Sequence, residues 1–253
     1  MNSRTHIVLL LVLLSCLLTN TNAHDRIVNG TPSNITVSPY MVSLRNLGTY
    51  FCSGGLVTLK LVITAAHCLT VFRVEHVSVV AGVTSLQETG QRRRVHTLYY
   101  SKSFNSTSRT MDIGAIKVRR AFIAGPTVTT IPLCRRKLKL GTKVRVSGWG
   151  VTYENSTDYV DILRTAVMPI VRRQFCAYHY KTVSIILSPS MICAGRGGID
   201  ACIGDSGAPG VVNGQLCGVV SFGKGCARAN FPGVYTNINN AKVRRFIRNV
   251  MNR

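Results

Sequence analysis

The chain has 253 residues, with 31 Lys and Arg against 9 Asp and Glu, which gives a formal net charge of +22. Its hydrophobic content of 46% excludes an intrinsically disordered protein. The positive charge favours an anionic partner such as glycosaminoglycan, nucleic acid, acidic mucin or membrane, although basic residues also serve solubility alone.

Residues 1–23 have the pattern of a secretory signal peptide. Arg4 supplies the positive start, residues 7–18 form an apolar run, and residues 21–23 end in small side chains suited to cleavage. Twelve residues rise about 18 Å as a helix, which is short of the roughly 30 Å of a bilayer core. We therefore expect a secreted, extracellular protein with no membrane span.

Short β-rich runs separated by turns occupy most of residues 40–238. The first six are residues 41–44, 51–56, 61–64, 77–81, 94–100 and 113–118, and the second six are residues 144–147, 163–167, 191–194, 210–212, 216–222 and 233–237. Residues 121–140, with one glycine and two prolines, indicate a linker between the groups. The predicted fold is all-β, with two six-stranded antiparallel β-barrels packed around a cleft.

One helix is predicted, at about residues 240–251. Val243, Phe246, Ile247 and Val250 recur at helical spacing and form one apolar stripe, while basic residues occupy the opposite face. We expect the stripe to dock on the second barrel.

Residues 200–209 read Asp-Ala-Cys-Ile-Gly-Asp-Ser-Gly-Ala-Pro. A serine hydroxyl is a weak nucleophile, so acyl transfer at Ser206 needs a base and donors for the developing oxyanion. Gly204 has no side chain, so its amide and that of Ser206 can converge on one oxygen. Taken alone, the same residues are equally typical of a surface turn.

Two other segments carry residues that fit this chemistry. His67 ends an apolar run beside Cys68, and Asp112 lies within an otherwise apolar stretch, where an unpaired charge is costly. Either residue by itself is a weak indication, because most single His and Asp residues are structural or solvated.

In the order His67, Asp112, Ser206, the sequence resembles the chymotrypsin/trypsin family of serine proteases, secreted arthropod trypsins among them. Ordered matches also occur at residues 27–30, 147–150, 221–223 and 232–235. The resemblance implies the roles of that family's catalytic triad: His67 is general base and then acid, Asp112 orients it, and Ser206 attacks to form an acyl-enzyme. The amides of Gly204 and Ser206 would form the oxyanion hole. No cofactor is implied.

The resemblance divides the chain into a signal peptide (residues 1–23), a short activation propeptide (residues 24–26) and a protease domain (residues 27–253). Within that domain we expect the first barrel at about residues 27–120, the linker at 121–140 and the second barrel at 141–238. An activating protease would cleave the zymogen after Arg26, and the freed ammonium of Ile27 would pair with Asp205.

The implied substrate is a protein or peptide with an exposed Arg or Lys. Asp200 matches the carboxylate at the base of the S1 pocket, and Gly223 and Gly233 match its walls, while a buried structural ion pair is the alternative for Asp200. Ala201 stands where many trypsins have a serine hydroxyl that helps to hold lysine. We therefore expect Arg to be preferred over Lys at P1.

Nine cysteines become eight once the signal peptide leaves, and an even number in a secreted chain favours disulfides. The resemblance implies the bridges Cys52–Cys68, Cys176–Cys193 and Cys202–Cys226. A further bridge common in trypsins would fall at Val144 and Val212, which carry no sulfur. We expect Cys134 and Cys217 to pair instead.

Other features are less specific. Asn34, Asn105 and Asn155 begin glycosylation sequons. The loop that binds calcium in many trypsins brings only Glu88, so no metal site is expected. Ala208 departs from the family glycine, and alanine would be strained there if the position needs a positive φ.

Protein inhibitors are expected partners, the protein is expected to be a monomer, and a glycosaminoglycan or another polyanion is a further possible partner. The rival interpretation is a weak or inactive protease homologue that acts as a cationic polyanion-binding protein.

Overall fold

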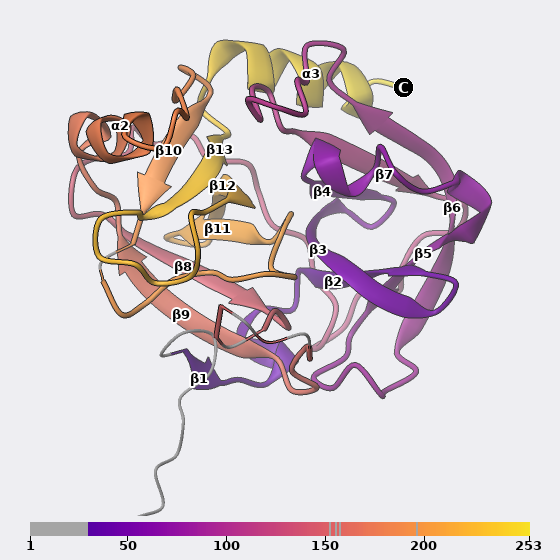
Figure 1. Cartoon of the computed structure of the whole chain (residues 1–253). Helices are drawn as coiled ribbons and strands as arrows, with labels where there is room; N and C mark the ends of the chain where they lie inside the picture. Colours follow the sequence, from indigo (N-terminus) through magenta and orange to yellow (C-terminus); the bar gives the residue numbers. More distant parts are fainter. Residues whose placement is uncertain (1–29, 152, 155, 157, 196) are drawn as a thin grey trace, which may run out of the picture.

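The computed structural model describes residues 30–151, 153–154, 156, 158–195 and 197–253. Two β-sheets lie side by side, with strands β2 to β7 in one and β8 to β13 in the other (Figure 1). The strands are β1 (Thr31–Pro32), β2 (Met41–Asn46), β3 (Thr49–Thr58), β4 (Leu61–Thr64), β5 (Val77–Ala81), β6 (Gln91–Tyr100), β7 (Gly114–Val118), β8 (Lys143–Gly148), β9 (Arg164–Pro169), β10 (Met191–Ala194), β11 (Pro209–Val212), β12 (Gln215–Phe222) and β13 (Gly233–Asn237). The α-helices are α2 (Arg173–Lys181) and α3 (Ala241–Met251), and the 3-10 turns are η1 (Ile35–Val37), η2 (Ala66–Cys68) and η3 (Val74–His76).

The first sheet is a closed antiparallel barrel in the order β2-β3-β4-β7-β6-β5. All six of its strands were predicted from the sequence. The central runs Met41–Asn46 and Leu61–Thr64 are almost wholly buried, which fits their apolar side chains. Because the barrel is closed, it has no unpaired strand edge to which an extended peptide could add as a further strand.

The second sheet has seven strands, in the order β1-β9-β8-β11-β12-β13-β10, and forms a half-barrel. Six of these are the predicted strands. The seventh is β1, where Thr31 pairs with Thr165 of β9. A two-residue strand has no period to recognise, so the sequence assigned this segment to the first barrel. The predicted second barrel is thus confirmed as a barrel-like sheet, with β1 added to its six predicted strands.

Helix α2 was missed by the prediction of one helix. Only Cys176 and Tyr180 of its nine residues are buried, a pattern too sparse to show helical spacing. Both of these residues are anchored: Cys176 in a disulfide with Cys193, and Tyr180 by donating to the carbonyl of Pro232 over 2.9 Å. The helix thereby braces the segment before β13.

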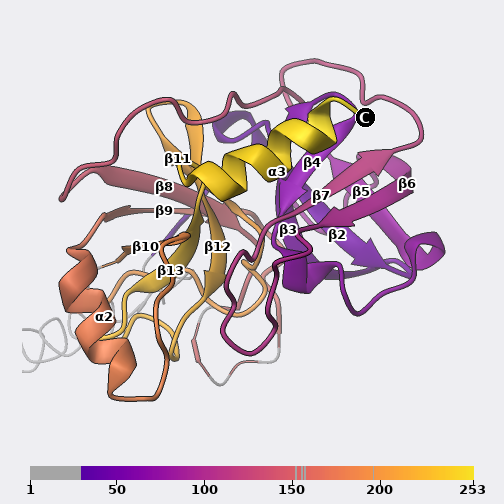
Figure 2. The ribbon, with the colours of Figure 1, turned by 90° about the horizontal axis from the view of Figure 1, so that it is seen from above.

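Helix α3 runs across both sheets (Figure 2). Its stripe buries Val243, Ile247 and Val250, as predicted. Docking is not confined to the second sheet, however, because Lys117 of β7 donates to the main-chain carbonyl of Arg253 over 3.0 Å. Within the described residues, neither α-helix is long and apolar enough to cross a bilayer.

The N-terminus of α3 gives a prediction about stability. Asn240 is the N-cap, and its side-chain oxygen accepts from the amides of Lys242 and Val243. Asn240→Ala should lower the free energy of unfolding by about 1 kcal/mol. Urea unfolding in a Ser206→Ala background, which removes self-digestion, measures this. Asn249→Ala, exposed on the same helix, is the matched control, and an equal loss in both variants would contradict the capping argument.

Candidate active site

The pairing of β4 with β7 brings His67 to Asp112. These strands are antiparallel, with Thr64 opposite Gly114, so the end of one lies beside the start of the other. His67 follows β4 in the turn η2, and Asp112 precedes β7. The imidazole Nδ1 lies 2.8 Å from Asp112 Oδ2.

The Asp112 carboxylate is fully buried and fully hydrogen-bonded. Its Oδ1 accepts from the His67 amide over 2.9 Å, and its Oδ2 accepts from the Ser221 hydroxyl over 2.5 Å. Thr236 donates to the Asp112 carbonyl over 2.7 Å. The sequence had not indicated the hydroxyls of Ser221 and Thr236 as partners of Asp112, since both lie more than a hundred residues away.

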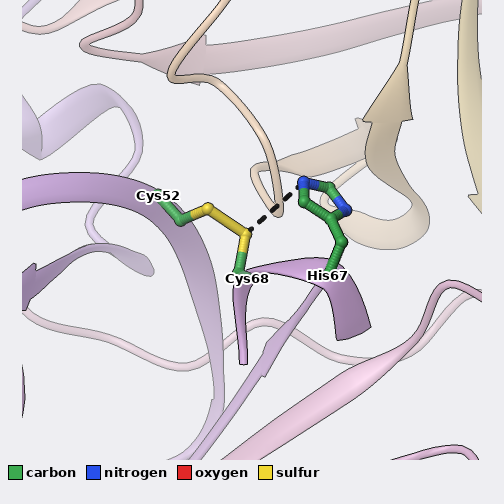
Figure 3. A group of neighbouring side chains, drawn as sticks. All are labelled: Cys52, His67 and Cys68. Atoms are coloured by element: carbon green, nitrogen blue, oxygen red, sulfur yellow. Dashed lines mark hydrogen bonds between the residues drawn. A yellow bond between two sulfur atoms is a disulfide. The ribbon is translucent and has the colours of Figure 1, made fainter. Parts of the chain in front are cut away.

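His67 also lies against the disulfide of Cys52 and Cys68, with its Nε2 3.8 Å from Cys68 Sγ (Figure 3). Three potential metal ligands gather here. The two sulfurs are bonded to each other and supply no thiolate, so this group does not have the donors of a zinc site.

The Ser206 loop is held from several sides. The carbonyl of Ser206 accepts from the amide of Ser53 over 2.9 Å, and the carbonyl of Gly204 accepts from the Tyr50 hydroxyl over 2.7 Å. Gly204 has φ +95°, and a Cβ there would lie 2.6 Å from the ring of Tyr159, so only glycine fits. The sequence had not indicated Tyr50 or Tyr159.

Ala208 is not strained. The positive φ values in this loop fall on Gly204 and Gly207, at +95° and +81°, while Ala208 is not among the left-handed positions and is completely buried. Alanine in place of the family glycine therefore costs no backbone strain. The expectation that this substitution weakens the loop depended on a positive φ that the structure does not have.

One cavity of about 470 Å³ joins most of the predicted site residues. They are His67, Ala201, Gly204, Ser206, Gly223 and Gly233. In the described part of the chain no hydrogen bond joins His67 Nε2 to Ser206 Oγ; catalytic hydrogen bonds commonly tighten only when substrate binds. Arg109 and Glu154 also line this cavity, and neither was predicted from the sequence.

Asp200 does not itself line this cavity, but it lies next to Ala201 and Gly233, which do, and one of its carboxylate oxygens is unsatisfied. The residue is 2% exposed, and its Oδ2 accepts a long bond of 3.4 Å from the Ala227 amide. Its Oδ1 has no hydrogen-bond partner among the described residues. A Cβ on Gly233 would lie 2.6 Å from that oxygen, so only glycine leaves space beside it. Burial raises the pKa of the Asp200 carboxyl to about 7.

Asp205 is completely buried behind the Ser206 loop. It accepts from the amides of Gly150 over 2.9 Å and Cys202 over 3.0 Å. Burial outweighs these two donors and raises the pKa of its carboxyl to about 6. Arg26 and Ile27, the expected activation residues, lie outside the described residues.

The rim of the cavity carries an ion pair. Arg228 binds both oxygens of Glu154, at 2.6 and 3.0 Å, above Gly225. A Cβ on Gly225 would lie 2.4 Å from atoms of both partners. This pair links the segment after Trp149 to the loop after β12, and no local pattern in the sequence indicates it.

Four disulfides join the eight cysteines of the described residues. They are Cys52–Cys68, Cys134–Cys217, Cys176–Cys193 and Cys202–Cys226. The side chains of Asn34 and Asn105 are exposed, and each accepts from a nearby amide within its own loop. The third sequon residue, Asn155, lies outside the described residues.

Comparisons with known proteins agree with this geometry. The sequence model described as Trypsin matches residues 27–246. Seminase of Drosophila melanogaster is 36% identical over 86% of this chain and 79% of its own length, and a trypsin of Xenopus laevis is 37% identical over 85% and 88%. A vitellin-degrading protease of Bombyx mori is 36% identical over 84% and 81%.

Among solved structures, neuropsin, a serine protease expressed in the limbic system of mouse brain, superimposes with a TM-score of 0.79 at 30% identity. The match covers 88% of this chain and 98% of neuropsin. The fold of this chain is thus that of a serine protease. The chain belongs to the trypsin family.

The pKa of Asp200 predicts how a small cation should bind the cavity. As pH falls through about 7, the carboxyl gains a proton and loses its attraction for the cation, so affinity for an aromatic amidine should fall about tenfold for each pH unit below 7. Titration calorimetry from about pH 5.5 to pH 8.5 measures this. Asp200→Asn should bind weakly and without this dependence, and an unchanged pH profile in that variant would show that another group is responsible.

Proposed function

We propose that this protein is a secreted serine endopeptidase, made as a zymogen, that cleaves protein and peptide substrates after Arg and less well after Lys. The observation that carries the proposal is the unsatisfied Asp200 Oδ1, buried next to Gly233 in the wall of the cavity that Ser206 and His67 also line. A buried carboxylate without a partner is costly. A cationic P1 side chain would supply that partner, so substrate binding would provide the hydrogen bonds and the charge that the Asp200 carboxylate lacks.

The reaction follows from the donors and acceptors around Ser206. His67, which lines the cavity, donates from Nδ1 to Asp112, so Nε2 is left as its basic nitrogen. In the proposed mechanism that nitrogen takes the Ser206 proton as Oγ attacks the scissile carbonyl, and it then protonates the leaving amine. Water repeats the cycle on the acyl-enzyme. The amides of Gly204 and Ser206 would hold the oxyanion.

The preference for Arg comes from geometry. Asp200 presents one free oxygen, and Ala201 beside it offers only a methyl group. A guanidinium reaches a carboxylate with a planar fork of donors, whereas an ammonium needs further acceptors to satisfy its three protons. Arginine should therefore be the better P1 residue.

Activation would act through Asp205. Its buried carboxylate has two amide donors but no cationic partner within the described residues. Cleavage after Arg26 would free the Ile27 ammonium to pair with it, and losing one partner of such a pair costs about 3–5 kcal/mol. The backbone of residues 202–206 would thus be held in its catalytic form only after cleavage.

An inactive homologue that binds polyanions is the rival function. Such a protein needs no intact catalytic constellation, yet Asp112 is fully hydrogen-bonded and Ala208 is unstrained. Both observations favour turnover.

The proposal predicts Arg-selective turnover by the activated protein. The precursor cleaved after Arg26 should hydrolyse a P1-Arg chromogenic peptide roughly tenfold faster, in kcat/KM, than the P1-Lys peptide, and a P1-Phe peptide hardly at all. Ser206→Ala should lower kcat by about five to six orders of magnitude.

The inactive homologue would be favoured if none of the three peptides is hydrolysed and an organophosphate does not label Ser206, in a protein whose Ile27 terminus has been confirmed. Equal rates on Arg and Lys peptides would contradict the role given to Ala201.

A second prediction concerns Arg109 at the cavity wall. If substrate pairs as a strand with residues 221–223, its side chains alternate, so P2 points away from Asp200 and towards the side of His67 and Arg109. An acidic P2 residue should raise kcat/KM about threefold over alanine, as expected for a partly exposed ion pair. Arg109→Gln should abolish this preference while leaving the P2-Ala peptide unchanged. Persistence of the preference in Arg109→Gln would contradict it.

A further inference from the structure

A second cavity, of about 430 Å³, is lined by arginine alone. Its walls are Arg92, Arg93, Arg94, Arg119 and Arg120. It shares no lining residue with the catalytic cavity. Like charges gathered around one concave surface repel each other, so an arrangement of this kind is stabilised by an anionic ligand.

The fold assembles this arginine cavity from two adjacent strands of the first barrel. Residues 92–94 lie in β6, and residues 119–120 follow the end of β7, its antiparallel neighbour (Figure 1). The amide of Arg119 donates to the carbonyl of Arg94 over 2.9 Å, which fixes one segment beside the other. The position of the five residues is therefore set by barrel pairing and not by a free loop.

Two of the arginines are held by the protein itself. Arg93 Nε donates to the carbonyl of Ala121 over 2.9 Å, and its guanidinium lies 5.1 Å from the centre of the Phe122 ring. Arg119 Nε donates to the carbonyl of Val95 over 3.2 Å. These contacts order the two side chains and contribute to the stability of the barrel.

The other three arginines are available to a ligand. Arg92, Arg94 and Arg120 are exposed, and within the described residues their guanidinium groups have no hydrogen-bond or ion-pair partner. Glu75 lines an adjoining hollow together with Arg94 and Arg119, and its carboxylate lies 3.8 Å from Arg73. A single exposed carboxylate does not neutralise five guanidinium groups.

We propose that the arginine cavity binds the sulfate groups of a sulfated polysaccharide. Guanidinium groups bind tetrahedral oxyanions through paired N–H donors, and three free forks on one concave surface match a ligand whose charges are closely spaced along a chain. Every lining residue is a cation, so recognition depends on anionic groups alone.

The same observations disfavour other polyanions. An acidic peptide gains much of its affinity from strand addition or from apolar anchors. Here β6 lies between β5 and β7 in a closed barrel, and no apolar side chain lines the cavity. Single-stranded nucleic acid needs aromatic side chains for base stacking, and the cavity has none.

The test compares two triple variants of equal charge. Arg92→Gln/Arg94→Gln/Arg120→Gln removes the free arginines of the cavity, while Lys242→Gln/Arg245→Gln/Arg248→Gln removes three exposed charges from α3. Arg93 and Arg119 are retained, because they stabilise the barrel. Both variants carry Ser206→Ala, so binding is measured without catalysis and does not depend on the proposed activity. Circular dichroism and urea unfolding check the fold of each variant.

Calorimetry with a heparin-derived octasaccharide should show affinity falling about tenfold or more in the cavity variant and less than about threefold in the α3 variant. Equal losses would show that net charge alone is responsible and would overturn the site. Polyglutamate and oligothymidylate of matched charge serve as competitors. Tighter binding of either competitor than of the octasaccharide, lost in the cavity variant, would overturn the assignment to sulfated polysaccharide.

Discussion

The burial of one carboxylate, that of Asp112, constrains the whole arrangement of the site. A charge placed in the interior must be compensated by hydrogen bonds, and the donors here come from both sheets. His67 donates from the first barrel, whereas Ser221 and Thr236 reach the same residue from β12 and β13 of the second sheet. Displacing one sheet relative to the other would leave this buried charge unsatisfied. The burial of Asp112 therefore requires that the two sheets keep the relative position that forms the cleft.

Three buried aspartates differ in how far they are satisfied. Asp112 has three donors to its carboxylate, Asp205 has two amides, and Asp200 has one long bond and a free oxygen. Burial raises the pKa values of Asp205 and Asp200, in keeping with their incomplete compensation. On the proposed function, each deficit is filled by a different cation: the new N-terminus for Asp205 and the substrate for Asp200. The missing hydrogen-bond partner of Asp205 would then make activity depend on cleavage of the precursor, and that of Asp200 would make the pocket selective for a cationic P1 side chain.

Much of the fold could be predicted from the sequence because most of its strands and the helix α3 have a recognisable pattern within a few neighbouring residues. Short β-rich runs separated by turns indicated twelve strands, and the stripe of Val243, Ile247 and Val250 indicated α3. The two-residue strand β1 and the sparse helix α2 carry no comparable pattern. The site divides in the same way: the motif residues were found by their local sequence, whereas Ser221 as a partner of Asp112, Arg109 and the Glu154–Arg228 pair depend on contacts between distant segments. Only the backbone angles could show that Ala208 is unstrained.

The net charge of the chain is positive, whereas the proposed pocket carries a negative charge. The two charges also act over different distances. Asp200 is one buried carboxylate, and on the proposed function it would act on a P1 side chain only at contact. The net charge of +22 acts over about 8 Å in physiological salt and repels broadly cationic substrates before they reach the cleft. A favourable substrate on these grounds is an acidic protein with an isolated arginine. A sulfated polysaccharide in the arginine cavity would reduce this repulsion near the first barrel, so binding there would change which proteins approach the active site without altering the S1 pocket.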